Sequence, residues 1–172
     1  MPKQPEMEQT VDTARSQSDS DAQFLAFVLG SEEYAVDILR VQEIRSWEPV
    51  SRIPNVNAYE KGVVNLRGAI VPIIDLRERF NLGHSEYTPV TVVVVLHTRD
   101  DTGRQRVMGV VVDAVSDVVD VDTGAVQMTP DFGARVSTEY INGIVSVGER
   151  MVMLLDVDKL LKLDGGDDAQ EN

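Results

Sequence analysis

The stretch that decides the fold runs from Tyr59 to Phe80 and reads YEKGVVNLRGAIVPIIDLRERF. It occurs again, less closely, from Tyr140 to Leu161, as YINGIVSVGERMVMLLDVDKLL. The two copies align without a gap, and most other pairs keep an apolar residue opposite an apolar one. The identical pairs are Tyr59 and Tyr140, Gly62 and Gly143, Val64 and Val145, Val71 and Val152, and Asp75 and Asp156. Such an internal repeat indicates a fold built from two copies of one unit.

Each copy is predicted to be a hairpin followed by a short helical turn. The first divides into a strand at 62–66, a tight turn at Arg67 and Gly68, a second strand at 69–74 and a helical turn at 76–80. Glycine adopts positive φ at no steric cost, which suits the turn. Asp75 stands where a helix N-cap is expected. Pro72 cannot donate a ladder hydrogen bond, so it predicts an edge strand or a bulge.

The similarity extends upstream, where AVDILRVQEI at 35–44 aligns with GVVVDAVSDV at 109–118. A strand-like run precedes each, at 24–29 and at 91–96, the second so apolar that it should lie between two layers. After Asp37, the spacing of Ile38, Val41 and Ile44 is helix-like. The sequence therefore predicts two mostly β modules, at 23–85 and 86–163, between disordered tails at 1–22 and 164–172. Exchange of terminal strands between the modules stays open.

Composition excludes several classes of protein. The chain has 172 residues, a net charge of -13, 42% hydrophobic residues and no cysteine. Such an acidic chain is not expected to bind nucleic acid or an anionic membrane. Without cysteine there is neither a disulfide framework nor a zinc–thiolate site. No secretory signal or spanning segment is visible, so we expect a cytoplasmic protein without direct membrane insertion.

The sequence shows no catalytic constellation. Its two histidines, His84 and His97, have no neighbouring ligand pattern, and no phosphate-binding glycine motif is present. Asp120 and Asp122 resemble the start of a calcium loop, but the glycine and glutamate that such a loop needs are missing. We therefore expect no enzyme activity, no metal and no cofactor.

Arg67 is the residue that most suggests a function. It stands at a predicted hairpin tip of an acidic protein, where its guanidinium could bind an acidic or amide-rich partner surface. The alternative is an ordinary solvated turn charge. The second copy has Gly148 at this position, so the repeat itself does not require the arginine.

Four segments resemble the CheW family of bacterial chemotaxis coupling proteins. They are FVLGSEEYAVDILRVQEIR, KGVVNLRGAIVPIIDLRERF, VVVDAVSDV and STEYINGI, within residues 23–163. The resemblance implies two SH3-like five-stranded β-barrels that share a core, with short helices. It also implies a non-enzymatic scaffold that couples the cytoplasmic tip of a methyl-accepting chemoreceptor to the regulatory domain of the CheA histidine kinase.

The resemblance further implies a receptor-binding surface in a groove between the modules. The family positions that carry over are Val41, Glu43, Ile44, Gly62, Arg67, Gly109 and Val118. It leaves the kinase-contact residues unknown, although exposed apolar loop ends of the first module are our expectation. The alternative is a regulatory module with a small molecule in the inter-module groove.

Overall fold

The computed structural model describes residues 21–82, 86–128 and 138–162. Apart from Asp21 and Ala22, both predicted tails lie outside these residues, as does His84. The strands are β1 (Asp21–Leu29), β2 (Glu32–Asp37), β3 (Val41–Ser46), β4 (Glu60–Leu66), β5 (Ala69–Asp75), β6 (Val92–Arg99), β7 (Gln105–Val112), β8 (Ala114–Asp122), β9 (Ile141–Val147) and β10 (Arg150–Leu155). The short helices α2 (Leu76–Arg79) and α3 (Val157–Leu160) follow β5 and β10.

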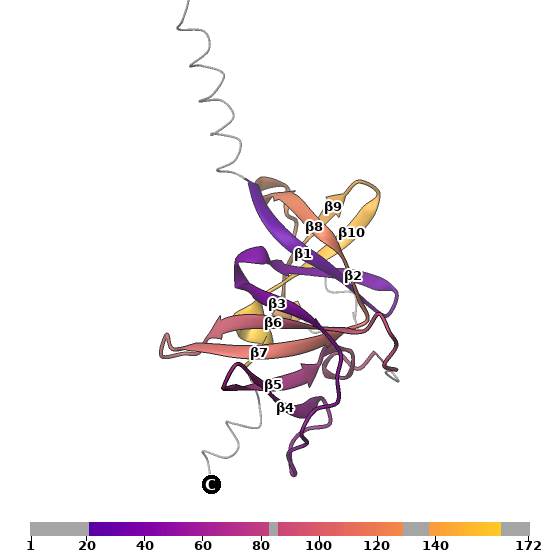
Figure 1. Ribbon diagram of the computed structural model, residues 1–172. Helices are drawn as coiled ribbons and strands as arrows, with labels where there is room; N and C mark the ends of the chain where they lie inside the picture. The colour runs from indigo at the N-terminus through magenta and orange to yellow at the C-terminus, as the bar shows by residue number, and fades with distance from the viewer. Residues whose placement is uncertain (1–20, 83–85, 129–137, 163–172) are drawn as a thin grey trace, which may run out of the picture.

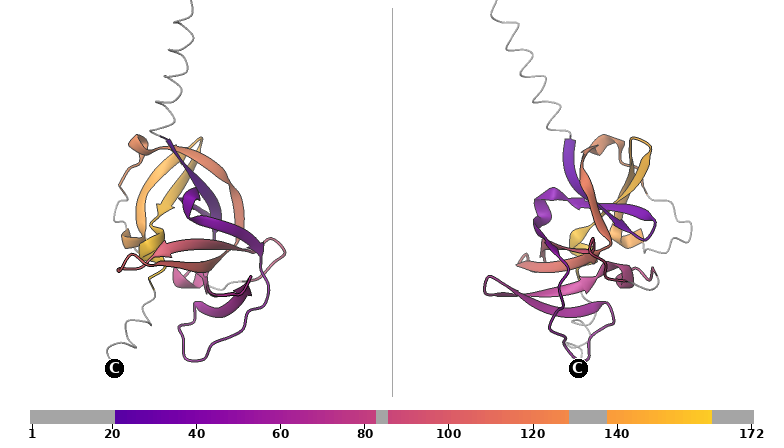
Figure 2. Two further views of the ribbon diagram at one scale, coloured as in Figure 1. Left: turned by 60° about the vertical axis from the view of Figure 1, so that its left-hand side comes forward. Right: turned by 45° about the vertical axis from the view of Figure 1, so that its right-hand side comes forward.

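The described residues form two five-stranded sheets, each curled into a small barrel (Figure 1). The strand order is β8-β1-β2-β10-β9 in the first, which we call barrel A, and β3-β6-β7-β5-β4 in the second, barrel B. In each order the first and last strands are sheet edges. Barrel A lies above barrel B in the views of Figures 1 and 2.

The two halves of the chain exchange strands. Under the sequence repeat, β1 to β5 correspond to β6 to β10. Barrel A takes β1 and β2 from the first half, and barrel B takes the equivalent β6 and β7 from the second. The modules at 23–85 and 86–163 thus describe the repeat in the sequence, whereas each barrel draws strands from both.

The repeat is visible at the level of single hydrogen bonds. The Asp75 N–H donates to the Tyr59 carbonyl at 2.8 Å, and the Asp156 N–H donates to the Tyr140 carbonyl at 2.9 Å. The Asp75 carboxylate caps α2 by accepting from the Arg77 N–H, and that of Asp156 caps α3. The predicted hairpins and caps are therefore confirmed in both copies.

Buried side chains gather in three layers of the described structure. A central cluster between the barrels holds Phe27, Tyr34, Leu76, Phe80 and Val94, among others. Smaller clusters fill barrel A, around Val119 and Val121, and barrel B, around Val93 and Val95. Successive residues of β6 thus point into the central core and into barrel B, as predicted for a strand without a wet face.

The predicted helical segment after Asp37 is mostly a strand. Asp37 caps a 3-10 turn at Ile38–Arg40, but β3 begins at Val41. A register irregularity between Val41 and Glu43 brings Val41 opposite Leu96 and Ile44 opposite Val94, both residues of the central core. A β-bulge inserts one residue, so two residues three apart face the same side and imitate helical spacing. An irregularity in β8 does the same for Val115 and Val118.

Two other expectations are corrected. Pro72 lies on β5, which is flanked by β4 and β7 and so is not an edge strand. Pro72 is not at a bulge either, because the register irregularity of the β4–β5 pair falls between Glu60 and Gly62. Proline is tolerated because the ladder to β7 covers only Ile73–Asp75. Asp21 and Ala22, which were expected in the N-terminal tail, belong instead to β1 and pair with β8.

Candidate partner-binding surfaces

The edge strands β3 and β4 face each other across the open side of barrel B, and we call this side seam B. An ion pair bridges seam B. Arg67, at the tip of the β4–β5 hairpin, donates to both carboxylate oxygens of Glu43 on β3, at 3.0 and 3.2 Å. Arg67 has φ of 53° and Gly68 has φ of 91°, as a two-residue hairpin turn requires. The Arg67 side chain is 67% exposed, so its guanidinium can reach a partner while it holds Glu43.

Barrel A has an equivalent ion pair that the sequence did not reveal. Arg150, at the start of β10, approaches Asp117 on β8 at 3.3 Å and Glu33 on β2 at 3.2 Å. Asp117 is the repeat equivalent of Glu43, but Arg150 stands two positions after Gly148, the equivalent of Arg67. Because the arginine comes from a different position, a position-by-position alignment misses it. Because both barrels carry an ion pair at the equivalent place, the Glu43–Arg67 pair across seam B also has a structural role.

Apolar side chains are exposed at the margin of the central core. Ile44 is 45% exposed and Val118 is 49% exposed. Each lies opposite a residue of the central core, Val94 for Ile44 and Leu25 for Val118, and so shares that face of its sheet. Val41 is half-buried against the same core.

The two glycines of the predicted site are buried in barrel B. Gly62 has φ of 148°, and a side chain there would run into the Ser51 carbonyl. A Cβ on Gly109 would lie 2.6 Å from Cδ1 of Ile73 and 2.8 Å from Cγ1 of Val93. Both positions therefore require glycine for packing, and neither presents a side chain to a partner.

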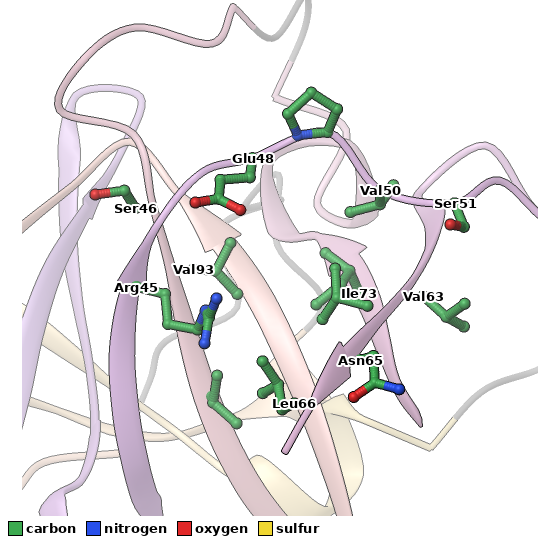
Figure 3. A pocket seen from close by; sticks show the side chains of 13 residues that line it. Arg45, Ser46, Glu48, Val50, Ser51, Val63, Asn65, Leu66, Ile73 and Val93 are labelled. Carbon is green, nitrogen blue, oxygen red and sulfur yellow. The ribbon is translucent and has the colours of Figure 1, made fainter. Parts of the chain in front are cut away.

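A cavity of about 250 Å³ opens in seam B (Figure 3). Its floor is apolar, with Leu66, Ile73, Val93 and Val95, and Arg45 and Glu48 belong to its polar lining. Of the predicted residues, the structure joins only Glu43 and Arg67 through a polar contact, and they lie at this seam. A second cavity, of about 30 Å³, lies beside Ile53 and Val56.

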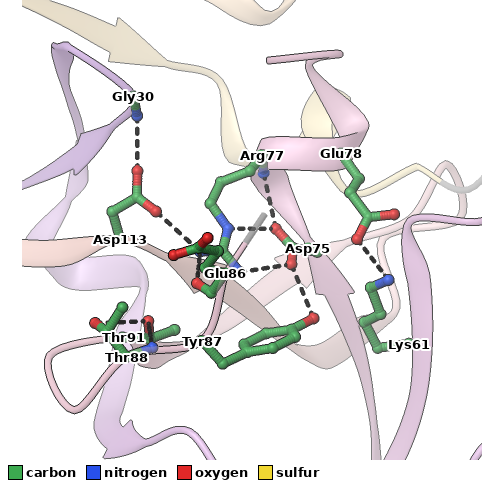
Figure 4. A network of polar contacts seen from close by, with 10 residues as sticks. All are labelled: Gly30, Lys61, Asp75, Arg77, Glu78, Glu86, Tyr87, Thr88, Thr91 and Asp113. Atoms are coloured by element: carbon green, nitrogen blue, oxygen red, sulfur yellow. Dashed lines mark hydrogen bonds and ion pairs between the residues drawn. The ribbon is translucent and has the colours of Figure 1, made fainter. Parts of the chain in front are cut away.

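A buried polar network ties α2 to the point where the chain crosses from barrel B to barrel A (Figure 4). Arg77 donates to both oxygens of Asp75, at 2.9 and 2.8 Å, and to Asp113 at 2.9 Å. Burial opposes its charge, but the hydrogen bonds to these two carboxylates outweigh burial and raise the pKa of Arg77. Burial, together with nearby Asp75, raises the pKa of Tyr87 to about 12, so its hydroxyl stays protonated and donates to Asp75 at 3.1 Å.

The second crossing, from barrel A to barrel B, is also tied to a short helix by an arginine–aspartate pair, but here the helix supplies the aspartate and the crossing supplies the arginine. Arg40, between β2 of barrel A and β3 of barrel B, donates to both oxygens of Asp158 on α3, at 2.7 and 2.8 Å. Asp158 also accepts from the Thr98 hydroxyl at 2.6 Å. The hydrogen bond from Arg40 is the largest cause that holds the pKa of Asp158 well below its usual range. Asp158 is the repeat equivalent of Arg77.

Metal and membrane features are absent from the part of the chain that the structure describes. Its His, Asp and Glu residues form no group of three or more that could hold a metal ion. Asp120 accepts from Gln23, and Asp122 caps a 3-10 turn, so neither belongs to a calcium loop. No helix of 18 residues or more with an apolar window occurs in this part.

The family model described as "CheW-like domain" matches residues 23–164. The chain belongs to the CheW family. It is 49% identical over 139 residues to "Chemotaxis protein CheW" of Klebsiella aerogenes, covering 81% of each chain. The CheW of Bacillus subtilis is 30% identical over 145 residues, which is 84% of this chain and 90% of that protein.

A solved CheW structure has the same fold. The scaffolding protein TtCheW from Thermoanaerobacter tengcongensis superposes with a TM-score of 0.73 at 26% identity, over 84% of this chain and 90% of that one. The fold expected for the CheW family, two five-stranded barrels sharing a core, is therefore confirmed. Nothing in these comparisons supports the alternative of a small-molecule-binding module.

Proposed function

We propose that this CheW-family chain is a non-enzymatic adaptor that couples the cytoplasmic tip of a methyl-accepting chemoreceptor to the regulatory domain of the CheA histidine kinase. The observation that carries this proposal is the family match, which spans both barrels and both crossings. The chain joins receptor arrays at the inner membrane through these partners and does not itself enter the bilayer.

The receptor surface has two parts with different chemistry. Val41, Ile44 and Val118 form an apolar margin beside the central core, suited to the apolar stripe of an amphipathic helix. Glu43 and Arg67 form a polar part at seam B, where the arginine fork can bind a carboxylate or an amide of the receptor.

Gly62 and Gly109 act indirectly. Because each is buried in barrel B, a substitution there displaces neighbouring side chains or backbone and does not remove a receptor contact. We therefore assign them a supporting role, with receptor contact confined to the exposed residues of the set.

The kinase surface is proposed at the loop between β3 and β4 of barrel B. Ile53 and Val56 on this loop are exposed large apolar side chains. Apolar side chains that become buried when a complex forms dominate the energetics of protein interfaces, whereas scattered surface charges contribute little. The expected effect of Ile53→Asp is weaker CheA binding with receptor binding retained.

The test is a pull-down with a purified receptor signalling fragment and, separately, purified CheA. Arg67→Glu should lose receptor binding because it reverses the charge and leaves Glu43 facing a second carboxylate. Arg106→Glu, an equal reversal at an exposed residue of β7 on the same sheet, is the matched control and should bind normally. Full receptor binding by Arg67→Glu would show that the assigned surface is wrong, and failure of the unaltered chain to bind either partner would refute the adaptor function.

A further inference from the structure

The seam B cavity exists because barrel B lacks a filling that barrel A has. In barrel A, Val119 and Val121 of β8 point inward and are buried. Their repeat equivalents on β3 and just after it are Arg45 and Trp47. Arg45 lines the cavity with its side chain 41% exposed, whereas Trp47 stacks on Tyr87 with ring centroids 4.2 Å apart. Trp47 also packs against the core of barrel B, so one buried valine of barrel A, Val119, is replaced by an opening in barrel B.

Arg45 is weakly held at this opening. Its nearest carboxylate, Glu43, lies 3.7 Å away and is already held by Arg67 at the shorter distance of 3.0 Å. A flexible side chain with one long contact can move aside at little cost, because exposed ion pairs contribute little. Arg45 therefore does not close the cavity.

The neighbouring strand edge is also unfilled. Within the described residues, the backbone of β3 pairs only with β6, so its other edge faces the seam without a ladder partner. At the opposite edge, β4 is met by an isolated bridge between Val63 and Ser51. An unpaired strand edge accepts an added extended strand, and an adjacent pocket then selects its alternate side chains.

The size of the cavity indicates the kind of occupant. At about 250 Å³ it is smaller than the roughly 300–1,000 Å³ typical of pockets for whole small molecules. The residue that fills the matching space in barrel A is β-branched and aliphatic and lies on an extended strand, namely Val119. A segment that supplies such a side chain would complete barrel B in the same way.

We propose that seam B is a docking site for an extended aliphatic segment of a protein partner, which adds a strand to the free edge of β3 and inserts Val-like side chains into the cavity. This site differs from the apolar margin assigned to the receptor helix, but it adjoins the Glu43–Arg67 pair of the receptor surface, which an added strand has to displace. Ile44 faces the central core, whereas Arg45 lies opposite Val93, whose side chain points into barrel B. The proposal does not depend on the adaptor function.

The test uses the full chain and a blocked peptide with the sequence Ser-Val-Thr-Val-Thr-Val-Ser, followed by amide and methyl NMR. Binding should shift the amides of Val41–Ser46 and the methyl groups of Val93 and Val95, and leave Val118 unchanged. A peptide with Pro in place of the first Thr cannot donate at that position and should bind at least tenfold more weakly.

Arg45→Val restores the residue type that fills barrel A and should weaken peptide binding at least tenfold. Arg106→Val makes the same substitution at an exposed site of the same sheet and should leave the affinity within twofold. Receptor-fragment binding by Arg45→Val should be unchanged, so the two proposals fail separately. Absence of shifts at millimolar peptide, shifts centred on Val118, or undiminished affinity of Arg45→Val would each overturn this docking site.

Discussion

The two crossing points offer a controlled test of how burial sets the cost of breaking an ion pair. Arg77 and Asp75 have side chains 5% and 0% exposed, whereas Arg40 and Asp158 are 29% and 37% exposed. Both arginines hold a carboxylate through two hydrogen bonds. The two-bond geometry is therefore shared, and the pairs differ in solvent access and in the additional hydrogen bond from Arg77 to Asp113.

Arg77→Leu leaves the Asp75 carboxylate buried without its cation. Removing one partner of a buried pair costs about 3–5 kcal/mol, because the remaining charge has lost both water and its counterion. Arg40→Leu leaves Asp158 in partial contact with water, still accepting from Thr98 and the Arg99 N–H. Its expected cost is about 1 kcal/mol, the upper range for solvent-accessible pairs.

The assay is urea unfolding followed by fluorescence of the single tryptophan, Trp47, and by circular dichroism. The midpoint should fall far more for Arg77→Leu than for Arg40→Leu, at an unchanged slope. A double variant that adds Asp75→Asn to Arg77→Leu should recover part of the loss, since it removes the buried charge. Equal losses for the two single variants would refute the argument that burial of the remaining carboxylate sets the cost.

Three further outcomes are expected. Gly62→Ala should lower the free energy of unfolding by about 2 kcal/mol or more, because the added Cβ meets the Ser51 carbonyl. Gly103→Ala, at an exposed turn with φ of 84° and open space around it, should lower it by about 1 kcal/mol. Similar losses for the two variants in chemical denaturation would contradict this expectation. Because the pKa of Asp158 is lowered in the folded state, its contribution to stability is present above the ordinary carboxyl range and is lost as pH falls through the folded-state value. Asp158→Asn should therefore flatten the decline in the free energy of unfolding below about pH 4. An unaltered decline in denaturation experiments from pH 7 to pH 3 would count against this expectation. Arg67→Glu should change the unfolding free energy by only about 0.5 kcal/mol, because the side chain is largely exposed, and a loss of several kcal/mol would show that its binding defect comes from unfolding.

The repeat made most of the architecture predictable. Two hairpins ending in Asp75 and Asp156 followed directly from the aligned segments, because turn glycines and capping aspartates act locally. The apolar strand at β6 was recognisable because both of its faces are buried. The strands β3 and β8 were not recognised, because a bulge brings residues three apart onto one face and imitates a helix.

The pairings between residues far apart in the chain could not be predicted from the sequence. Exchange of β1 and β2 with β6 and β7 depends on tertiary packing, which no local pattern encodes. Arg67 was singled out by its predicted hairpin tip and Glu43 by the family resemblance, but their mutual ion pair depends on the three-dimensional fold. The Arg150–Asp117 pair had no signal at all, because its arginine is displaced from the repeat position. The seam B cavity likewise had no signal in the sequence, because it depends on how β3 and β4 lie in three dimensions.

The most direct measurement of the adaptor function is the autophosphorylation rate of CheA in the presence of receptor-bearing vesicles, with and without this chain. We predict that receptor and kinase together show no ligand-dependent rate, and that adding the chain makes the rate respond to receptor ligand. A kinase rate that ignores receptor ligand in the presence of the folded chain, or one that responds equally without it, would contradict the adaptor function.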